Sequence, residues 1–384
     1  IARYAVDARW LVPHFEKMLY DNAQFLDLLC SAHAFPHAAL YRARADETVG
    51  WLLREMLAEG DAFAATLDAE SEHEEGKFYV WQAEEIDAAL GADAAVFKRA
   101  YGVRPQGNWE GKTILHRLAS MPYPHPEEAA LAVARADLFG LREGRVRPAR
   151  DDKVLADWNG LMIAALVHAG VAFGEPSWIA IAQRAFAFIA ASMTKDDRLG
   201  HSWRDGRLLF PGLASDYAAM IRAALALHEA TGEGDYLAQA LRWQDALERH
   251  YIDPATGGYF LTADDAEGLV VRPHSTADDA IPNHNAVAAA NLVRLAAASG
   301  DDRFRTRADQ LFDGVLVIAE KNLFAHVALL NALDLRLRGA EIVVTGSGKA
   351  AQALIDAALA APFTDRIVLR APSADALPDN HPAR

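Results

Sequence analysis

Apolar residues recur every three to four positions along three long segments of the chain, and each segment opens on a polar residue and stops at a glycine. This spacing places apolar side chains on one face of a helix, and glycine is a common helix stop. The pattern therefore predicts three helices of similar length. The segments are 157–174, 216–232 and 285–300, opened by Asp157, Asp216 and Asn285.

The same short motif follows each predicted helix. An acidic residue comes directly after the glycine, and an aromatic residue (Trp178, Tyr236 or Phe304) comes four positions after it, where a second helix begins. Asp21 opens a weaker, earlier copy of the pattern. The stretch between Asp21 and Asp157 leaves room for one more diverged repeat, so we expect at least five helix pairs.

Short β runs are predicted in the connectors between the helix pairs. Helix pairs joined by β-hairpins are typical of a closed ring, in which the hairpins and the heads of the inner helices share one face. We therefore predict a mainly α fold, an (α/α)6 toroid over residues 1–338, with one pocket at its mouth. The β runs are 78–81, 201–203 with 208–210, and 259–262 with 269–271.

The pattern changes near residue 338. Strands at 342–346 and 367–369 flank a predicted helix at 348–361, which indicates a small β-α-β segment over 339–384 that we expect to be truncated. The printed sequence begins at Ile1 and ends at Arg384, so we expect it to be a piece of a longer, cytoplasmic protein.

Composition narrows the function classes. The net charge of −15 argues against nucleic acid and favours neutral, hydroxyl-rich or cationic ligands. No apolar run approaches the roughly 20 residues of a membrane helix. Cys30 is the one cysteine, so it has no internal disulfide partner, and no histidine pair has ligand spacing beside a carboxylate. We therefore predict no metal site and no cofactor.

Two polar stretches carry the candidate chemistry. One leads into the helix at Asp157, where a carboxylate either caps the helix or lines a cavity. The other is read as a polar stripe on a helix that begins near Pro13. The candidates are Asp151, Asp152, Lys153, Asp157, Trp158 and Asn159 in the first stretch, and His14, Glu16, Lys17, Tyr20 and Asp21 in the second.

Several motifs resemble one family. They are residues 3–7 with 10–21, 75–81, Asn108 with 110–112, and 151–153 with 158–161, and together they resemble the bacterial YyaL and spermatogenesis-associated protein 20 family. The resemblance implies a thioredoxin-like domain ahead of this region, which the printed sequence lacks, and a toroid similar to N-acylglucosamine 2-epimerases and six-hairpin glycosidases. Where the family has Pro-Ser-Gly-Asn, this chain has residues 282–285, so only Pro282 and Asn285 match.

Three interpretations remain open. In the first, the toroid is a carbohydrate-active enzyme: Asp157 and Asp216 act as a glycosidase pair, or His14 and His284 act as epimerase bases. Trp109, Trp158 and Tyr20 would then stack on sugar faces, with Asn285 beside them. In the second, the toroid is a binding or scaffold module for the thioredoxin-like domain. In the third, it is purely structural. We favour the first, because residues 151–153 have no counterpart before Asp216 or Asn285.

Overall fold

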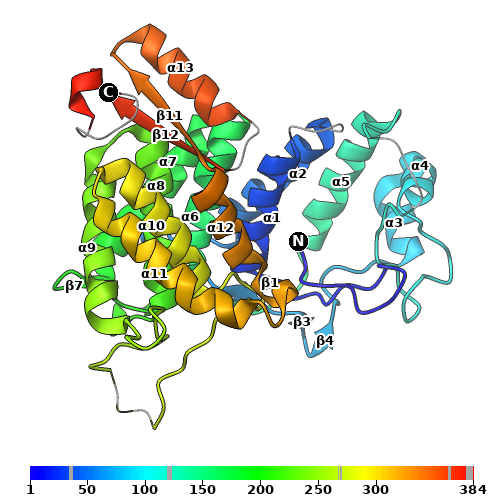
Figure 1. Cartoon of the computed structure of the whole chain (residues 1–384). Coiled ribbons are helices and arrows are strands. Elements are labelled where there is room, and N and C mark those ends of the chain that lie inside the picture. Colours follow the sequence, from blue (N-terminus) through cyan, green and yellow to red (C-terminus); the bar gives the residue numbers. More distant parts are fainter. Residues whose placement is uncertain (34–37, 119–122, 267, 269, 362–364, 378–383) are drawn as a thin grey trace.

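The computed structural model describes residues 1–33, 38–118, 123–266, 268, 270–361, 365–377 and 384. Its main body is a row of helical hairpins (Figure 1). The first helices of the hairpins pack against one another in the order α1, α6, α8, α10 and α12, and each hairpin's second helix lies outside. The hairpins are α1 (Leu19–Ala32) with α2 (Ala38–Glu55), α6 (Ala156–Ala172) with α7 (Pro176–Ser192), α8 (Ala214–Thr231) with α9 (Gly234–Tyr251), and α10 (His284–Ser299) with α11 (Asp302–Ala319), followed by α12 (Val327–Arg338). The predicted fold class, a mainly helical α/α toroid, is confirmed.

Burial separates the inner from the outer helices. In α6 nearly every side chain is buried, which suits a helix packed on several sides, whereas α9 and α11 bury one face. Small residues bring the inner helices together: a Cβ added at Gly160 of α6 would lie 2.7 Å from the Ala219 backbone of α8. The second helices begin where the motif predicted them, and the aromatic residues Trp178 and Phe304 in their first turns are buried.

The predicted glycine stops of two inner helices are confirmed. Gly232 and Gly300 adopt left-handed backbone, with φ of 79° and 70°, directly after α8 and α10. Each donates its N–H to the carbonyl four residues earlier, at His228 and Ala296 respectively. Only a residue that tolerates positive φ satisfies these terminal carbonyls without strain, which explains why glycine stands there.

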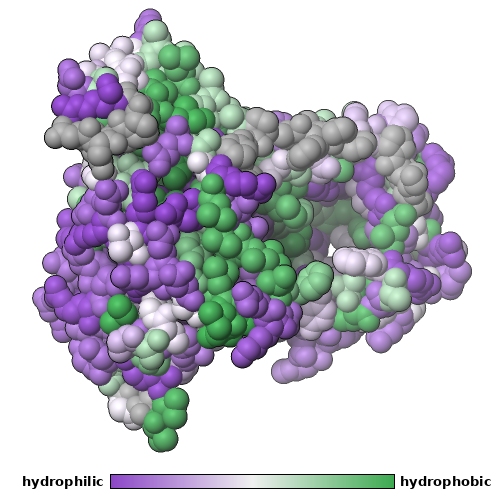
Figure 2. Space-filling view, in the orientation of Figure 1, coloured by the Kyte–Doolittle hydropathy of each residue, from purple (hydrophilic) through white to green (hydrophobic). Residues whose placement is uncertain are grey.

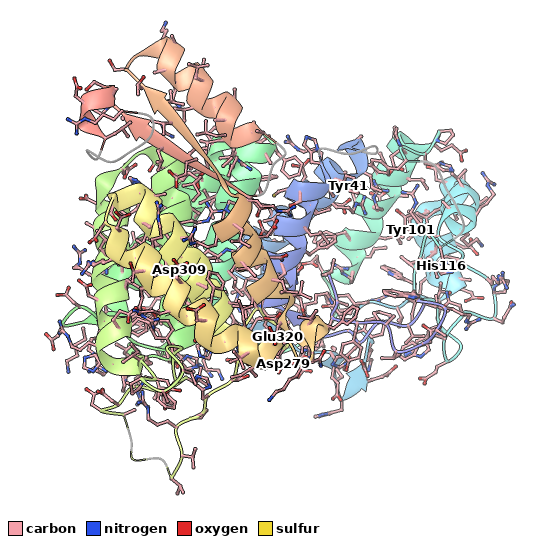
Figure 3. The ribbon with its side chains drawn as sticks, viewed as in Figure 1. Tyr41, Tyr101, His116, Asp279, Asp309 and Glu320 are labelled. Atoms are coloured by element: carbon pink, nitrogen blue, oxygen red, sulfur yellow. The ribbon has the colours of Figure 1, made fainter. Side chains whose placement is uncertain are left out.

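The prediction of a diverged repeat between Asp21 and Asp157 is wrong, because α1 packs directly on α6. The short helices α3 (Ala83–Leu90) and α4 (Ala94–Ala100), with α5 (Glu128–Arg142), bury Ile86, Phe97 and Leu131 against one another in a separate apolar cluster. In Figure 3, Tyr101 and His116 lie with these helices, far from Asp309 on α11. These short helices bury their apolar faces against one another, so those faces do not pack against the row of inner helices.

The predicted connector strands hold for one hairpin. Strands β9 (Ser202–Arg204) and β10 (Arg207–Leu209) pair, and β6 (Val154–Leu155) joins β9. The strand predicted at 78–81 is wrong: Tyr79 and Val80 donate to the Gly76 carbonyl in a turn, and Trp81 makes only a bridge to Thr113. The strands predicted near 260 and 270 are also wrong in the described residues, apart from a bridge between Tyr259 and Ile252; residue 269 lies outside them.

The first inner helix begins later than predicted. Instead of starting near Pro13, α1 begins at Leu19, because β1 (Lys17–Met18) pairs with β2 (Thr66–Leu67), which pairs with β5 (Arg150–Asp151). Successive residues of a strand point to opposite faces. His14 and Lys17 are therefore not members of one helical stripe with Asp21, and that prediction is wrong. The remaining short strands are β3 (Glu70–Ser71), β4 (Glu74–Glu75), β7 (Thr194–Lys195) and β8 (Arg198–Leu199).

The last part of the chain forms the predicted β-α-β segment. Strands β11 (Ala340–Thr345) and β12 (Arg366–Ala371) are parallel and flank α13 (Lys349–Ala360). This unit lies at the C-terminal ends of the inner helices (Figure 1), where Ile355 of α13 belongs to an apolar cluster that includes Val171 of α6. The division of the chain at residue 338 stays a prediction.

The visible face of the molecule is uneven in polarity. Figure 2 shows apolar side chains gathered over α12, where Val327 and Leu337 are exposed, and polar ones over α9 and α11. Among the described residues, no helix has the length and apolar character needed to span a membrane.

Candidate functional site

Asp157 and Asp216 meet at the heads of neighbouring inner helices. Asp157 lies in the first turn of α6 and Asp216 in the first turn of α8. Asp216 Oδ1 accepts the backbone N–H of Asp157 at 3.0 Å, and its Oδ2 accepts the N–H of Leu213 at 2.7 Å. Asp157 accepts the N–H of Trp158 at 2.8 Å and the hydroxyl of Ser215 at 3.1 Å. The two residues thus cap their helices and join them.

His201 completes this cluster from the connector before α8. Its Nδ1 lies 3.0 Å from Asp216 Oδ2, and its side chain is 24% exposed, whereas the Asp216 side chain is fully buried. Backbone bonds fix the residue: His201 donates its N–H to Leu209 and accepts from Ala156. Among the described residues, the Nε2 atom of His201 has no hydrogen-bond partner. Asp216 therefore orients the ring through Nδ1, and Nε2 stays available to a ligand.

The electrostatics of the cluster separate its three titratable groups. The hydrogen bond and charge of Asp216 raise the pKa of His201 to about 9, despite partial burial. Burial, followed by the charge of Asp216, raises the pKa of Asp157 to about 7. Burial also raises the pKa of Asp216, although His201 and two backbone N–H groups oppose it. At neutral pH the cluster therefore pairs a charged imidazole with a carboxylate and leaves Asp157 near its midpoint.

Two cavities lie beside the β9–β10 hairpin, next to His201 in sequence. The larger has a volume of about 630 Å³ and is lined by Lys153, Ser202 and Arg204 among others. The smaller, of about 240 Å³, is lined by Asp152, Trp203 and Glu59 among others. Trp203 donates its indole N–H to Glu59 at 2.9 Å. An aromatic ring flanked by carboxylates and arginines is suited to a hydroxyl-rich ligand.

Of residues 151–153, the predicted asymmetric feature of the site, Asp152 and Lys153 line these cavities. Lys153 pairs with Asp151, at 3.1 Å between Nζ and Oδ2, and its charge lowers the pKa of His201 against the larger effect of Asp216. Asp152 accepts from Arg150 at 2.6 Å. Lys153 and Asp152 are thus the predicted residues that line cavities, whereas Asp157 and Asp216 lie buried behind them.

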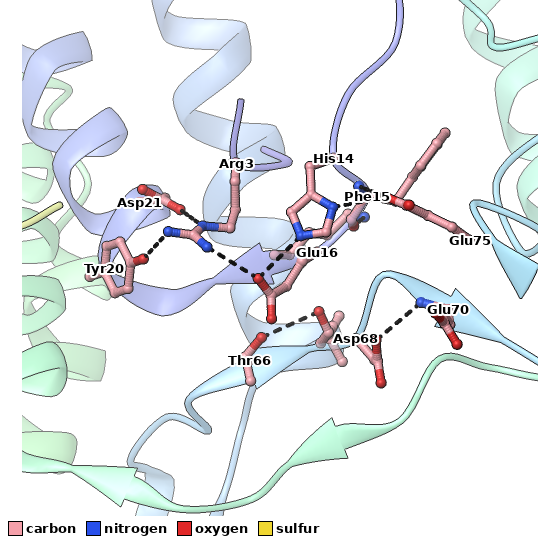
Figure 4. A network of polar contacts seen from close by, with 12 residues as sticks. Arg3, His14, Phe15, Glu16, Tyr20, Asp21, Thr66, Asp68, Glu70 and Glu75 are labelled. Carbon is pink, nitrogen blue, oxygen red and sulfur yellow. Dashed lines mark hydrogen bonds and ion pairs between the residues drawn. The ribbon is translucent and has the colours of Figure 1, made fainter. Parts of the chain in front are cut away.

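A second polar network occupies the head of α1 (Figure 4). The Arg3 guanidinium donates to the Tyr20 hydroxyl at 2.6 Å and pairs with Glu16 and Asp21 at 3.4 and 3.5 Å. His14 lies 3.6 Å from Glu16 and 2.8 Å from Glu75. The Tyr20 ring meets the edge of Trp158, with centroids 4.7 Å apart, so this network borders the head of α6.

Lys17 and Trp109 belong to different surroundings. The Lys17 ammonium donates to the Phe15 carbonyl at 3.0 Å and stands 3.5 Å from the centre of the Tyr79 ring. Burial, and then the charge of Arg142, lowers the pKa of Lys17 to about 7. Trp109 packs against Phe15, with ring centroids 5.6 Å apart. The structure does not bring these two residues to the Asp157 cluster.

Three other predicted residues have their polar atoms occupied by the fold. Asn159 is fully buried and accepts the N–H of Phe63 while its amide donates to the carbonyls of Phe63 and Leu155. Asn285 accepts the N–H of Tyr259, and His284 Nε2 lies 3.0 Å from the Tyr259 carbonyl. Burial lowers the pKa of His284 to about 4, so it stays neutral.

Sequence reasoning missed His201, Ser215 and Trp203 as site residues. His201 and Trp203 were read only as members of a β run, although a histidine directly before a connector strand and ahead of the Asp216 helix was available as a signal. Ser215 immediately precedes Asp216. No apolar periodicity marks such residues, since their place depends on how the hairpin folds back over α6.

The cluster has the residue types of a metal site, because ligand atoms of Asp157, His201 and Asp216 lie within 4.8 Å of one another. Each carboxylate oxygen, however, already accepts a protein hydrogen bond. A bound cation would therefore share these oxygens with the backbone N–H groups and the Ser215 hydroxyl that they already accept.

No family model matches the chain. It is 30% identical to spermatogenesis-associated protein 20 of Mus musculus and of Homo sapiens, in each case over 78% of this chain. The chain spans only 43% and 44% of the length of these relatives.

Solved structures with similar folds have low sequence identity. They include a sugar epimerase from a ruminal bacterium (12% identical, 81% of this chain and 79% of that one, TM-score 0.46). A cellobiose 2-epimerase from Bacillus thermoamylovorans is 8% identical over 88% of this chain and 66% of that one, with a TM-score of 0.46. At these identities the likeness carries no information about activity.

Proposed function

We propose that this chain, which is related to the spermatogenesis-associated protein 20 family as its motifs indicated, is a carbohydrate-active enzyme of the isomerase or epimerase type. The observation that carries the proposal is the Asp216–His201 pair. A fully buried carboxylate holds one ring nitrogen of a partly exposed histidine at 3.0 Å, and Ser202, the next residue along the chain, lines a cavity. This is the arrangement in which one group orients a proton-transfer residue.

The three groups of the cluster would divide the work. An isomerase or epimerase moves a proton to and from a carbon next to a sugar carbonyl, so negative charge develops on the carbonyl oxygen. The His201 imidazolium, kept charged by Asp216, would donate to that oxygen and stabilise the enediolate. Asp157, with a pKa of about 7, is the group that can gain or lose a proton at neutral pH.

A glycosidase mechanism with Asp157 and Asp216 is less well supported. Such enzymes place two carboxyl groups on either side of the scissile bond, roughly 5 to 9.5 Å apart. The Asp216 side chain is fully buried, and both of its oxygens accept backbone N–H groups. It has no free oxygen to present to a sugar ring, so we assign it as a positioning residue.

A second candidate function is supported by the same hydrogen bonds. Because the Asp157 and Asp216 oxygens accept backbone N–H groups and the Ser215 hydroxyl, the cluster also suits a scaffold whose helix heads are tied together. In that case the toroid would serve the thioredoxin-like domain that the resemblance implies, without chemistry of its own.

Product analysis separates the two functions. The wild-type protein would be incubated with a panel of aldoses, ketoses and β-linked disaccharides, and the sugars separated by chromatography. The enzyme proposal predicts conversion of at least one sugar and loss of conversion in His201→Asn and Asp157→Asn. Asp301→Asn, which alters the cap of outer helix α11, serves as the matched control and should keep wild-type conversion. No conversion and no thermal shift with any sugar would place the scaffold function first.

A further inference from the structure

Three polar side chains, an aspartate, a histidine and an arginine, meet away from the mouth on three consecutive inner helices. Asp27 of α1 lies 2.7 Å from His168 Nδ1 of α6 and 2.6 Å from Arg222 Nη2 of α8, with one carboxylate oxygen for each. Because α6 lies between α1 and α8 in the row of inner helices, the contact of Asp27 with Arg222 passes across α6. The trio therefore lies on one face of the row, where it links three of its helices.

The trio lies deep in the ring. His168 follows Asp157 by eleven residues on α6, which corresponds to about 16 Å along the helix axis. Val171, one turn further, packs against the apolar cluster of α13. The trio thus stands between the polar heads of the inner helices and the C-terminal β-α-β unit, and it is separate from the His201 cluster.

These side chains remain open to solvent. Asp27 is 32% exposed, His168 is 40% exposed and Arg222 is 29% exposed. After Asn159, His168 is the one polar side chain of α6; every other residue is apolar or glycine. Packing of α6 against its neighbours does not require a polar side chain at His168.

The trio also has unused hydrogen-bonding capacity. Among the described residues, His168 Nε2 and the remaining Arg222 N–H groups have no partner. Asp27 has both oxygens occupied. Although burial alone would raise the pKa of Asp27, the charges of His168 and Arg222 outweigh it and hold that pKa below its ordinary value. One donor would be enough for an ion pair that only holds two helices together. Here two donors share the Asp27 carboxylate, and each keeps further nitrogen atoms without a partner among the described residues.

We propose that His168 and Arg222 form a binding site for a small oxyanion, a phosphate or carboxylate group, with Asp27 as the residue that positions both. A guanidinium with free N–H groups binds such oxygens through paired hydrogen bonds. His168, when protonated, donates from Nε2 to the same anion. Asp27 supplies one negative charge against that of the guanidinium, and a protonated His168 would leave the trio with a net positive charge for the ligand.

Titration with inorganic phosphate and, in a separate arm, with acetate tests the site. Binding would be followed by the ring resonances of His168 in NMR spectra and by calorimetry on the full chain. We expect one anion to shift the His168 signals saturably, and Arg222→Gln to weaken its binding about tenfold or more. Arg222→Lys, which keeps the charge but loses the planar fork, should fall between. Arg184→Gln on outer helix α7 is the matched control and should bind as the wild type does.

The two titrations identify the ligand class: binding of phosphate alone indicates a phosphate site, and binding of acetate alone indicates a carboxylate site. If Arg222→Gln does not fold, as judged by circular dichroism, His168→Gln takes its place with the same expected loss. Unchanged His168 signals with both anions, or unchanged affinity in the variants, would overturn the proposal. Neither readout involves His201 or sugar conversion, so this test is independent of the proposed enzyme activity.

Discussion

Asp216 Oδ1 accepts the backbone N–H of Asp157 at 3.0 Å, so the first turn of α8 caps the first turn of α6. Asp216 also accepts the N–H of Leu213 in its own helix and holds His201. One buried carboxylate therefore joins two inner helices and one connector. The stability of the ring's mouth and the orientation of the proposed proton-transfer residue depend on the same side chain.

Removing that carboxylate should cost substantial stability. Asp216→Ala leaves two backbone N–H groups and the His201 imidazole without their acceptor, so we expect a loss of about 3 kcal/mol in the free energy of unfolding. Asp301→Ala removes an ordinary cap of outer helix α11 and should cost about 1 kcal/mol. Urea unfolding of both variants measures the difference. Equal losses would show that Asp216 is a simple helix cap.

The pKa of His201 is a direct consequence of this contact. Titration of the imidazole by NMR should give a value of about 9 in the wild type. In Asp216→Asn it should fall toward the ordinary value of about 6.5, because the charge that stabilises the imidazolium is gone. Since the folded-state pKa is raised, His201 contributes stability that is complete below pH 6.5 and lost as pH rises through about 9. A value near 6.5 in the wild type would contradict the pairing.

Asp157 should make stability depend on pH in the opposite direction to an ordinary ion-paired aspartate. Its pKa is raised from 3.8 to about 7, so the folded state keeps a proton that the unfolded state releases. The stability cost therefore grows between about pH 4 and pH 7 and is complete above that. Asp157→Asn removes the titration, and its melting temperature relative to the wild type should rise from pH 4.5 to pH 8. A constant difference would exclude a raised pKa.

Lys17 provides a test away from the cluster. Its pKa is lowered to about 7, chiefly by burial, so the folded protein resists protonation that the unfolded chain accepts below about 10.5. The resulting cost grows as pH falls from 10.5 to 7. The melting temperature of Lys17→Met relative to that of the wild type should therefore rise as the pH is lowered from 9.5 to 6.5. Lys195→Met, at an exposed position, is the control for replacing a lysine by methionine.

Periodicity predicted those parts of the fold that depend on local spacing. The runs opened by Asp157, Asp216 and Asn285 and the stops at Gly232 and Gly300 follow from the helix repeat and from glycine's access to positive φ, and the structure contains them. The start of α1 did not follow, since Lys17 and Met18 pair with a strand about fifty residues away. Pairing between distant segments leaves no periodic mark near His14.

The candidate site was predicted in part for the same reason. Asp157 and Asp216 stand at equivalent places in two repeats, and adjacent repeats bring equivalent residues together. His201 joins them only because the β9–β10 hairpin folds back onto β6, whereas Ser215 lies in α8 next to Asp216. No pattern predicts the meeting of Asp27, His168 and Arg222, because each has apolar neighbours on both sides in the sequence and their meeting depends on the packing of three helices.

The most direct test of the central claim is solvent deuterium exchange at a sugar carbon. Reducing sugars incubated in D2O with the wild-type protein would be followed by NMR at the position next to the carbonyl group. The account predicts that the wild type and Asp301→Asn incorporate deuterium into at least one sugar, and that a folded His201→Asn does not. Exchange at the uncatalysed rate with the wild type, or equal exchange in His201→Asn, would contradict the claim that His201 stabilises the enediolate at this site.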